Sequence, residues 1–491
     1  MQDWLTARAN ATPDRLALVD HTAAGQPVSY TYRDLNRLAG GLAAWLAAQG
    51  VQPGDRVAAL LDNSAAYVAL IHAIRQIRAV LVPLNTRLVA HEIAWQVAHV
   101  GCHLLVYAPR FAEAAAQAAI PARPVPALTT LAASESPQLA VRLESPAAIV
   151  FTSGTTGHPK GALLTHGNLF HSAMASAYRL GVLPTDRWLC SLPLYHVGGL
   201  SIVLRSCLYG TAIDLLDGFD AERVDALLRQ TPITLVSLVP TMLYRLLAIK
   251  HHPWHAALRL LLIGGAALST DLAARALADG LPIATTYGLT EAASQVATAL
   301  PDEVAARPGT VGKPLIFTSV TVVDEAGNPL PPDEIGEIVV SGPTVMAGYF
   351  HDLDTLDALP APGPLRTGDL GRLDAAGNLW LVQRRSDLIV SGGENVYPAE
   401  VENVLLRHPA IQAACVVGVP HPEWGQQVAA AIVRTPGRAL TAEEVVRHVR
   451  QHLAGYKQPR RILFVDALPQ TASGKINRRS VMDLFDEHRN D

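Results

Sequence analysis

The sequence predicts an α/β protein with two domains of unequal size. The chain has 491 residues, which is more than one hydrophobic core usually accommodates. Through the first hundred residues, helical patterns alternate with short apolar runs such as residues 56–61. This alternation is typical of mostly parallel, doubly wound sheets with helices on their faces. Later the pattern changes to short strands with turn signals, and then to a separate α+β module.

The elements of the large domain can be placed from their composition. Residues 112–145 are rich in Ala, Pro and Ser and predict a surface connection. Apolar runs predict buried strands at residues 147–151, 235–239 and 260–263. Residues 315–350 combine short strands with turn signals, which predicts a small antiparallel, β-rich subdomain.

The carboxy-terminal part predicts a smaller α+β domain. Strands are expected at residues 379–382 and 414–419. Thr441 and Glu444 have the spacing of a capping box and precede a helix with one apolar face.

The boundary between the two domains is expected directly after Gln383. Consecutive charged residues interrupt the apolar pattern there. We therefore expect an amino-terminal domain at residues 1–383 and a carboxy-terminal domain at residues 384–491.

Composition and charge restrict the class of protein. The formal net charge of −4 at pH 7 argues against a nucleic-acid partner, because such partners favour a basic surface. The four cysteines lack metal-ligand spacing and lie among apolar residues, so we expect small buried hydrophobic side chains. No amino-terminal signal and no apolar run of about eighteen residues is visible. These features predict a cytoplasmic protein without a membrane span.

A loop rich in Gly, Thr and Ser follows the strand expected at residues 147–151. Residues 152–161 read Thr-Ser-Gly-Thr-Thr-Gly-His-Pro-Lys-Gly. Glycines let backbone N–H groups close on an anion, the hydroxyls add donors, and Lys160 adds a positive charge. The spacing differs from that of a Walker A loop. Taken alone, the loop fits either a phosphate site or an ordinary surface turn.

This loop resembles the signature of the AMP-forming adenylating superfamily, which includes acyl-CoA synthetases, luciferases and peptide-synthetase adenylation domains. Further segments match the family's pattern in order along nearly the whole chain: residues 192–196, 264–266, 286–291, 367–369, 384–402 and 473–475. The resemblance implies an enzyme that uses ATP and Mg²⁺ to convert a carboxylic acid to an acyl-adenylate, and then transfers the acyl group to coenzyme A. It also implies that the small domain is mobile and rotates between the two steps, and the charged junction Arg384–Arg385 is the expected hinge.

The resemblance also implies roles for individual residues. Tyr287 is expected to stack on adenine, Glu291 to hold Mg²⁺, and Asp369 to bind the ribose hydroxyls. The implied catalytic residues are Lys475, Glu291, Lys160 and His196. The implied ATP- and AMP-binding residues are Thr152, Ser153, Gly154, Thr155, Thr156, Gly157, Lys160, Gly264, Gly265, Ala266, Thr286, Tyr287, Gly288, Leu289, Thr290, Asp369, Arg384 and Lys475. The implied CoA-binding residues are Gly392, Gly393 and Lys457.

Several of these side chains also have a simpler interpretation. Tyr287 suits core packing, Glu291 suits a helix amino-terminus, and Asp369 suits a turn. His196 is either a gate beside the acyl pocket or a buried core histidine. Lys457 is either a CoA contact or a surface lysine.

The chemistry of adenylation explains the residue types. A carboxylate must meet the anionic α-phosphate of ATP, so cations are needed where negative charge accumulates. Lys475 and Mg²⁺ supply them. The carboxylate of Asp369 suits a diol because it accepts two hydrogen bonds, and Arg384 adds a fixed fork of donors toward the same ribose.

The acyl pocket is expected around residues 198–206, an apolar run that holds one cation, Arg205. A buried cation needs a partner, so Arg205 is either part of a structural ion pair or a clamp for a second carboxylate on the substrate. Residues 193–201, 290–295 and 384–389 resemble the corresponding segments of the o-succinylbenzoate–CoA ligases of menaquinone biosynthesis, whose substrate keeps a benzoate carboxylate. The expected pocket residues are Tyr195, His196, Gly199, Arg205, Ser294 and Gln295.

Other functions remain open on the sequence alone. One is a ligase for another aryl or medium-chain carboxylic acid. A second is an adenylation enzyme that feeds a carrier protein, and a third is a catalytically silent nucleotide-binding regulator. A monomer and a homodimer are both compatible with the sequence.

Overall fold

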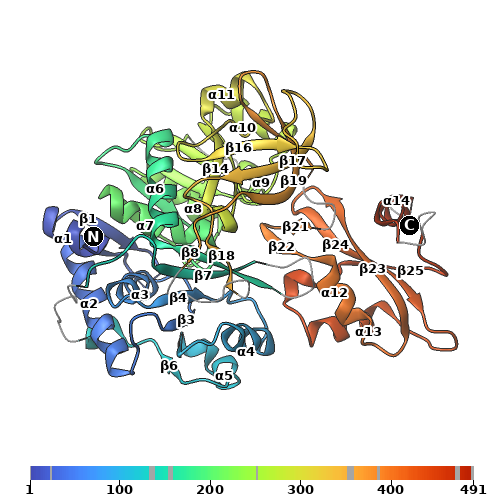
Figure 1. Cartoon of the computed structure of the whole chain (residues 1–491), viewed down its shortest axis with the longest axis horizontal. Helices are drawn as coiled ribbons and strands as arrows, with labels where there is room; N and C mark the ends of the chain where they lie inside the picture. The colour runs from blue at the N-terminus through green and yellow to red at the C-terminus, as the bar shows by residue number, and fades with distance from the viewer. Residues whose placement is uncertain are drawn as a thin grey trace. The chain divides into compact units, whose positions relative to one another are not determined.

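A computed structural model of the chain describes residues 2–22, 25–131, 139–152, 159–249, 253–350, 359–383, 388–469 and 476–487. The chain divides into two compact units (Figure 1). Unit 1 comprises Met1–Thr86, Ile93–Phe151 and Gly161–Gln383, and unit 2 comprises Arg87–Glu92, Thr152–Lys160 and Arg384–Asp491. The main division therefore falls between Gln383 and Arg384, while two short amino-terminal segments belong to unit 2.

The first sheet of unit 1 has nine strands in the order β15-β14-β13-β12-β11-β9-β10-β1-β2. The strands from β13 to β1 run parallel, and the outer strands are antiparallel. They are β1 (Leu16–Asp20), β2 (Val28–Thr31), β9 (Arg187–Cys190), β10 (Ala212–Leu215), β11 (Leu235–Leu238), β12 (Leu260–Ile263), β13 (Ile283–Leu289), β14 (Ser294–Ala299) and β15 (Lys313–Pro314). The strands predicted from the two later apolar runs, β11 and β12, are confirmed and fully buried.

The second sheet has seven strands in the order β18-β8-β7-β4-β3-β5-β6. They are β3 (Arg56–Leu60), β4 (Val80–Pro83), β5 (Leu104–Tyr107), β6 (Ala122–Pro124), β7 (Pro146–Thr152), β8 (Lys160–Thr165) and β18 (Gly348–Tyr349). The predicted α/β class with parallel, doubly wound sheets is thus confirmed. Residues 112–145, which were predicted to form a surface connection, contain the short elements α5 (Ala112–Ala116) and β6.

Helices pack together with both sheets in one hydrophobic core. Side chains of both sheets share a single apolar cluster with α2 (Tyr32–Ala48), α3 (Ala65–Gln76), α6 (His166–Leu180) and α7 (Val197–Tyr209). Helix α2 packs against α3, and α6 packs against α7 (Figure 1). Helix α3 is buried along nearly its whole surface, which is typical of a helix between two layers. The four cysteines are all buried, as predicted.

Among the other described helices of the large part, α1 precedes the first strand and each of the rest follows a strand. They are α1 (Trp4–Ala11), α4 (Ala90–His99), α8 (Ala221–Gln230), α9 (Pro240–Ala248), α10 (Thr270–Ala278) and α11 (Pro301–Ala306).

The predicted antiparallel subdomain is a four-stranded sheet in the order β16-β17-β19-β20. Its strands are β16 (Ser319–Val323), β17 (Gly336–Ser341), β19 (Leu365–Leu373) and β20 (Leu379–Gln383). The strand expected at residues 379–382 exists as β20 and lies in unit 1, on the amino-terminal side of the boundary predicted after Gln383, and not in the carboxy-terminal module with which its apolar run was grouped. Strand β20 pairs with β19 in unit 1, and such pairing across a turn is invisible in a count of apolar residues.

The described residues of unit 2 after Gln383 include a five-stranded sheet and the helices α12, α13 and α14. They are β21 (Ile389–Ser391), β22 (Glu394–Val396), α12 (Pro398–Leu405), β23 (Ile411–His421), β24 (Gly425–Arg434), α13 (Ala442–Arg450), β25 (Arg461–Phe464) and α14 (Arg478–Glu487). The predicted capping box at Thr441 and Glu444 is confirmed. Val445 and Val449 of α13 are buried against the sheet.

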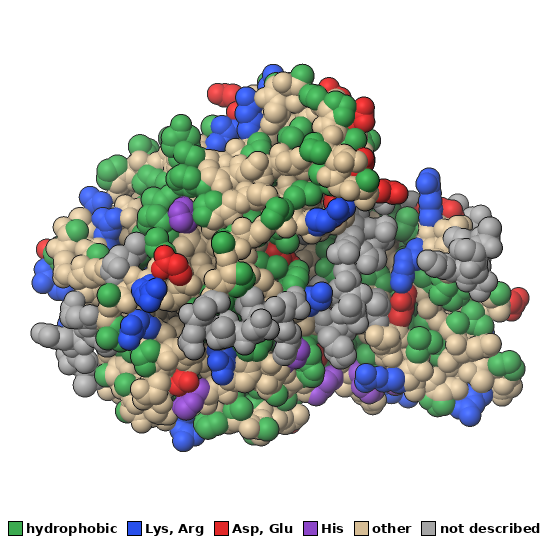
Figure 2. Space-filling view, viewed as in Figure 1, with side chains coloured by type: hydrophobic (Ala, Val, Ile, Leu, Met, Phe, Trp, Pro, Cys, Tyr) green, Lys and Arg blue, Asp and Glu red, His purple; other side chains and the backbone are tan. Residues whose placement is uncertain are grey.

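Helix composition and surface charge bear on whether the protein contacts membranes or charged partners. Among the described residues, no helix is both long and apolar enough to cross a membrane. On the face shown in Figure 2, the coloured Lys and Arg side chains lie interspersed with Asp and Glu.

Candidate functional site

A hydrogen bond between two predicted nucleotide-binding residues connects the nine-stranded sheet to the β subdomain. The hydroxyl of Tyr287 in β13 donates to Oδ2 of Asp369 in β19 at 2.6 Å. Both side chains are buried, with 5% and 7% of their surface exposed. The Tyr287 ring also belongs to the apolar cluster of the β subdomain, which agrees with the packing interpretation. The structure therefore brings the predicted adenine and ribose residues into direct contact.

Glu291 lies just beyond β13, in a single 3-10 turn (Thr290–Ala292). Its Oε1 accepts a hydrogen bond from the hydroxyl of Tyr349 at 2.9 Å, and its backbone carbonyl accepts one from the N–H of Met346 at 2.8 Å. The side chain is half-buried. Tyr349 fixes the position of this carboxylate, and no local sequence signal had indicated it.

Two glycines of the predicted nucleotide site are required by packing. A Cβ at Gly288 would lie 1.9 Å from the carbonyl oxygen of Ser294. A Cβ at Gly264 would lie 2.7 Å from Cγ2 of Thr286. Real Cβ atoms do not approach so closely, so these glycines let neighbouring segments pack directly around the end of β13.

The backbone after Glu291 is strained. Ala293 and Ser294 have φ of +54° and +114°, in a region that non-glycine residues rarely adopt. The carbonyl of Ala293 accepts a hydrogen bond from Oγ of Ser172 at 2.7 Å. Such strain persists where surrounding contacts maintain it, and it is frequent at functional sites.

Arg205 is fully buried in α7 among neutral partners. Its Nε donates to the carbonyl of Ser201 at 3.1 Å, and its Nη2 donates to Oγ of Ser201 at 2.8 Å. Its Nη1 donates to Oγ of Ser176 at 3.3 Å and to Oε1 of Gln295 at 3.2 Å. The Trp188 ring centroid lies 5.1 Å from the guanidinium carbon. Within the described part of the chain, no carboxylate forms an ion pair with Arg205.

The neutral surroundings leave the charge of Arg205 uncompensated by nearby acids. Burial lowers the pKa of the guanidinium, although a guanidinium stays protonated in proteins. Of the four contacting side chains, the sequence had indicated only Gln295. Ser201 lies one turn before Arg205 in α7, whereas Ser176 and Trp188 come from α6 and β9, and only tertiary folding brings these two to Arg205.

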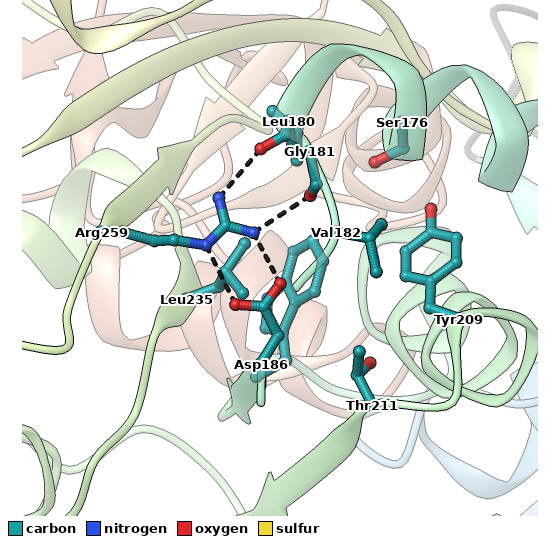
Figure 3. A pocket seen from close by; sticks show the side chains of 10 residues that line it. Ser176, Leu180, Gly181, Val182, Asp186, Tyr209, Thr211, Leu235 and Arg259 are labelled. Carbon is teal, nitrogen blue, oxygen red and sulfur yellow. Dashed lines mark hydrogen bonds and ion pairs between the residues drawn. The ribbon is translucent and has the colours of Figure 1, made fainter. Parts of the chain in front are cut away.

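Ser176 and Trp188 also line a small cavity of about 10 Å³. Figure 3 shows the Arg259 side chain beside it, with hydrogen bonds to the carbonyls of Leu180 and Gly181 and an ion pair to Asp186. A volume of this size has room for about one water molecule. The cavity lies by the first residues of β9 and β11, whereas ligands of open α/β sheets bind beyond the carboxyl ends of the strands. It is therefore separate from the candidate site.

The segment before α7 places the other predicted pocket residues. The rings of Tyr195 and His196 contact each other edge to face, with centroids 4.6 Å apart. His196 is half-buried at the start of α7, so it is not a fully buried core histidine. A Cβ at Gly199 would lie 2.3 Å from the carbonyl oxygen of Pro193, which explains why a glycine occupies this position.

The predicted CoA residues of unit 2 lie in two different environments. Gly392 and Gly393 form the turn between β21 and β22, with φ of +60° and +85°. Two consecutive positive φ angles are typical of a two-residue hairpin turn. A Cβ at Gly392 would also lie 2.7 Å from the ring of Trp424. The hairpin therefore needs these glycines whether or not a ligand approaches them.

Lys457 is not the surface lysine that one interpretation predicted. It is 2% exposed, and its Nζ lies 2.6 Å from Oε1 of Glu92 and 2.8 Å from Oε1 of Glu400, all within unit 2. Burial acts to lower the pKa of Lys457, but the carboxylates of Glu400 and Glu92 outweigh it and raise the pKa. A buried lysine is tolerated here because two acids compensate its charge.

Several predicted residues lie outside the described residues. They are Ser153, Gly154, Thr155, Thr156, Gly157, Arg384 and Lys475. Thr152 ends β7 and Lys160 begins β8, so the described residues include both ends of the predicted phosphate loop.

Comparison with known proteins agrees with this arrangement. The AMP-binding enzyme family matches residues 5–350, and the AMP-binding enzyme C-terminal domain matches residues 400–475. The chain therefore belongs to the AMP-binding enzymes, and among them it is an adenylate-forming acid–thiol ligase.

Particular relatives cover almost the whole chain. A 2-succinylbenzoate–CoA ligase of Geobacillus sp. (strain WCH70) is 38% identical over 490 residues, which are 99% of this chain and 98% of the relative. A feruloyl-CoA synthase of Amycolatopsis sp. is 41% identical over 490 residues and 98% of each chain.

Solved structures of one such relative match as well. A double mutant of o-succinylbenzoate CoA synthetase from Bacillus subtilis, bound to the product analogue OSB-NCoA, superimposes with a TM-score of 0.91 at 37% identity over 98% of each chain. The same synthetase in complex with ATP and magnesium ion gives a TM-score of 0.73 at 36% identity, over 98% of this chain and 99% of that one.

Proposed function

We propose that this enzyme activates 2-succinylbenzoate. In the first step, the succinyl carboxylate attacks the α-phosphate of ATP and diphosphate leaves. In the second step, the thiol of coenzyme A attacks the acyl carbon and AMP leaves, which yields 2-succinylbenzoyl-CoA. The benzoate carboxylate takes no part in either step and remains an anion.

The observation that carries this substrate is the environment of Arg205. A buried cation surrounded by neutral groups is costly unless an anion compensates it. The second carboxylate of a dicarboxylic acid supplies that anion, and a planar guanidinium matches a carboxylate well. Ser201 and Gln295, which already accept hydrogen bonds from Arg205, hold the guanidinium in place. The 2-succinylbenzoate–CoA ligases among the relatives support the same substrate.

A second candidate is a hydroxycinnamic acid, because a feruloyl-CoA synthase shares 41% identity with this chain. Such a substrate has one carboxylate, which is consumed in the reaction. It leaves no anion for Arg205, so the surroundings of this residue favour the dicarboxylic acid.

The nucleotide is proposed to bind beside the Tyr287–Asp369 pair. Asp369 accepts hydrogen bonds from the ribose hydroxyls, Tyr287 contacts adenine, and Arg384 donates to the ribose. Lys475 bridges the attacking carboxylate and the α-phosphate, where a positive charge stabilises the transition state most.

The residues also fit a magnesium ion. Mg²⁺ in nucleotide sites is usually held by one or two carboxylates together with phosphate oxygens. Glu291 is a half-buried carboxylate that can act as such a ligand. Among the described residues, no group of three His, Cys, Asp or Glu side chains forms a complete protein cage. The ion neutralises phosphate charge when bound.

Coenzyme A is proposed as the acceptor, with the Gly392–Gly393 turn beside its pantetheine. A glycine turn permits close backbone approach. The contact of Lys457 with coenzyme A stays a prediction. The ammonium of Lys457 is already engaged by the carboxylates of Glu92 and Glu400.

The test is AMP release by the full-length protein with ATP, Mg²⁺ and coenzyme A over a panel of acids. The panel holds 2-succinylbenzoate, its ester at the ring carboxylate, ferulate and octanoate. We expect the highest kcat/KM with 2-succinylbenzoate and a large loss with the ester, which keeps the reacting carboxylate. A higher kcat/KM with ferulate would favour the second candidate. Thioester formation on a phosphopantetheinyl carrier protein but not on coenzyme A would exclude the proposed acceptor.

A further inference from the structure

We infer that Tyr349 is a positioning residue for Glu291, and that its hydroxyl sets the affinity of the site for a nucleotide-bound divalent cation. The hydroxyl of Tyr349 donates to Oε1 of Glu291 at 2.9 Å, and both residues lie in unit 1. Carboxylates that bind metal ions are usually hydrogen-bonded in turn, and these partners tune the metal affinity. The inference rests on the proposed function, because it assumes that Glu291 is a ligand of Mg²⁺.

The position of the Tyr349 ring is set by the second sheet. Tyr349 ends β18, which pairs with β8 in antiparallel register. Just before this strand, the N–H of Ala347 donates to the carbonyl of Leu163 in β8 at 3.1 Å. The ring packs against the apolar cluster that both sheets share. The hydroxyl therefore reaches Glu291, which follows β13 of the first sheet, from a strand of the second sheet.

The segment before β18 is held by a helix and by the backbone of Glu291. Asn168 lies in the first turn of α6 and is 2% exposed. Its Nδ2 donates to the carbonyl of Pro343 at 2.9 Å and to that of Val345 at 2.7 Å. The N–H of Met346 donates to the backbone carbonyl of Glu291 at 2.8 Å. The backbone and the side chain of Glu291 are thus attached to the same segment of the chain.

The turn that carries Glu291 is held independently of Tyr349. The N–H of Ala293 donates to the carbonyl of Thr290 at 3.0 Å, and the carbonyl of Ala293 accepts from Oγ of Ser172 at 2.7 Å. With the backbone fixed in this way, the hydrogen bond from Tyr349 acts on the side-chain torsions of Glu291. Glutamate is among the side chains that lose most rotamer freedom when they are ordered. Loss of the hydroxyl should therefore leave the turn intact, and the metal ion must then order the carboxylate itself.

Metal-dependent binding of a nucleotide separates this role from a structural one. The probe is α,β-methylene-ATP, because its bridge between the α- and β-phosphates resists cleavage. Its Kd for the full-length protein is measured by calorimetry with Mg²⁺ and, separately, with EDTA. Tyr349→Phe keeps the ring and removes the hydroxyl. It should weaken binding with Mg²⁺ by about 10- to 100-fold, whereas binding with EDTA should stay within about twofold of the parent protein.

Two further variants and a matched control complete the experiment. Glu291→Gln should lose the same metal dependence, and adding Tyr349→Phe to it should cause no further loss, because both changes act on one carboxylate. The control is Tyr32→Phe, which removes a buried hydroxyl that donates to the carbonyl of Ser206 at 2.8 Å elsewhere in unit 1. It should leave the metal dependence within about twofold of the parent protein.

The outcomes separate the positioning role from the proposed function. Equal weakening of binding with Mg²⁺ and with EDTA in Tyr349→Phe would overturn the inference, since it indicates a general structural effect. An unchanged metal dependence would overturn it too, and so would additive losses in the double variant. If Glu291→Gln keeps the full metal dependence, the proposed metal role of Glu291 fails. If Glu291→Gln loses it while Tyr349→Phe keeps it, only the positioning role is refuted.

Discussion

Replacing Arg205 with methionine distinguishes a carboxylate clamp from a structural cation. Arg205 donates four hydrogen bonds to its neighbours, and each contributes about 1 kcal/mol to stability. The substitution also removes a buried charge that no described carboxylate compensates, and burying such a charge costs several kcal/mol. Because the two effects oppose each other, the free energy of unfolding should change by less than about 2 kcal/mol.

The effect on catalysis depends on the second carboxylate of the substrate. A hydrogen bond to a charged group contributes about 1.5–3 kcal/mol, and about 1.4 kcal/mol corresponds to a tenfold change in affinity. Arg205→Met should therefore raise KM for 2-succinylbenzoate by about 10- to 150-fold. The control acid is 4-oxo-4-phenylbutanoate, which is the same molecule without the ring carboxylate. Its KM should change by less than about twofold.

The assay is steady-state AMP release at saturating ATP and coenzyme A, with thermal unfolding as the check on folding. Arg205→Lys keeps the charge but loses the planar fork, so its KM should lie between those of the parent and Arg205→Met. Equal increases in KM for both acids would refute the clamp and leave Arg205 with a structural role.

Three further predictions concern catalysis, packing and pH. Lys475→Ala should abolish acyl-adenylate formation while ATP binding stays nearly intact; unchanged ATP–diphosphate exchange would exclude this assignment. Gly288→Ala should unfold or inactivate the enzyme, because its Cβ would lie 1.9 Å from the Ser294 carbonyl. The control Gly218→Ala, whose Cβ would meet nothing within 4 Å, should shift the melting temperature by less than about 2 °C, and equal effects of both would contradict the packing argument. Burial lowers the pKa of His72 from 6.5 to about 3, so below pH 6.5 only the unfolded chain gains this proton. Denaturant unfolding should show stability falling by about 2 kcal/mol from this group between pH 6.5 and pH 5. His72→Gln should remove that contribution, and an unchanged pH dependence would contradict it.

Much of the fold was predictable because its signals are local. Continuous apolar runs marked β11 and β12, since strands buried on both faces need apolar residues on both. Thr441 marked the start of α13, because a helix cap is completed within four residues. The predictions were less complete where the partner is distant. The apolar run of β20 was grouped with the strands of the carboxy-terminal module, although the predicted boundary lies after it, because its pairing with β19 leaves no trace in its own composition.

The candidate site shows the same division. Lys457 was expected at the surface or against coenzyme A, because a lone lysine in a sequence is usually solvated. It is buried instead, since Glu92, 365 residues away, and Glu400 lie beside it. Arg205 was recognised as unusual from its apolar run, but the neutrality of its partners was not predictable. Those partners come from α6, α7, β9 and β14, and Ser176 and Gln295 lie 29 and 90 residues from Arg205.

The sequence by itself determined the class of chemistry, because the family's motifs are short segments whose glycines, hydroxyls and charges act within a few residues. Only the tertiary structure decided which of these groups meet. It joins Tyr287 to Asp369 across 82 residues and Arg478 to Glu402 across 76 residues. Hydrogen bonds and ion pairs between such distant segments depend on the packing of whole sheets and helices, and packing of that kind is a property of the folded chain as a whole.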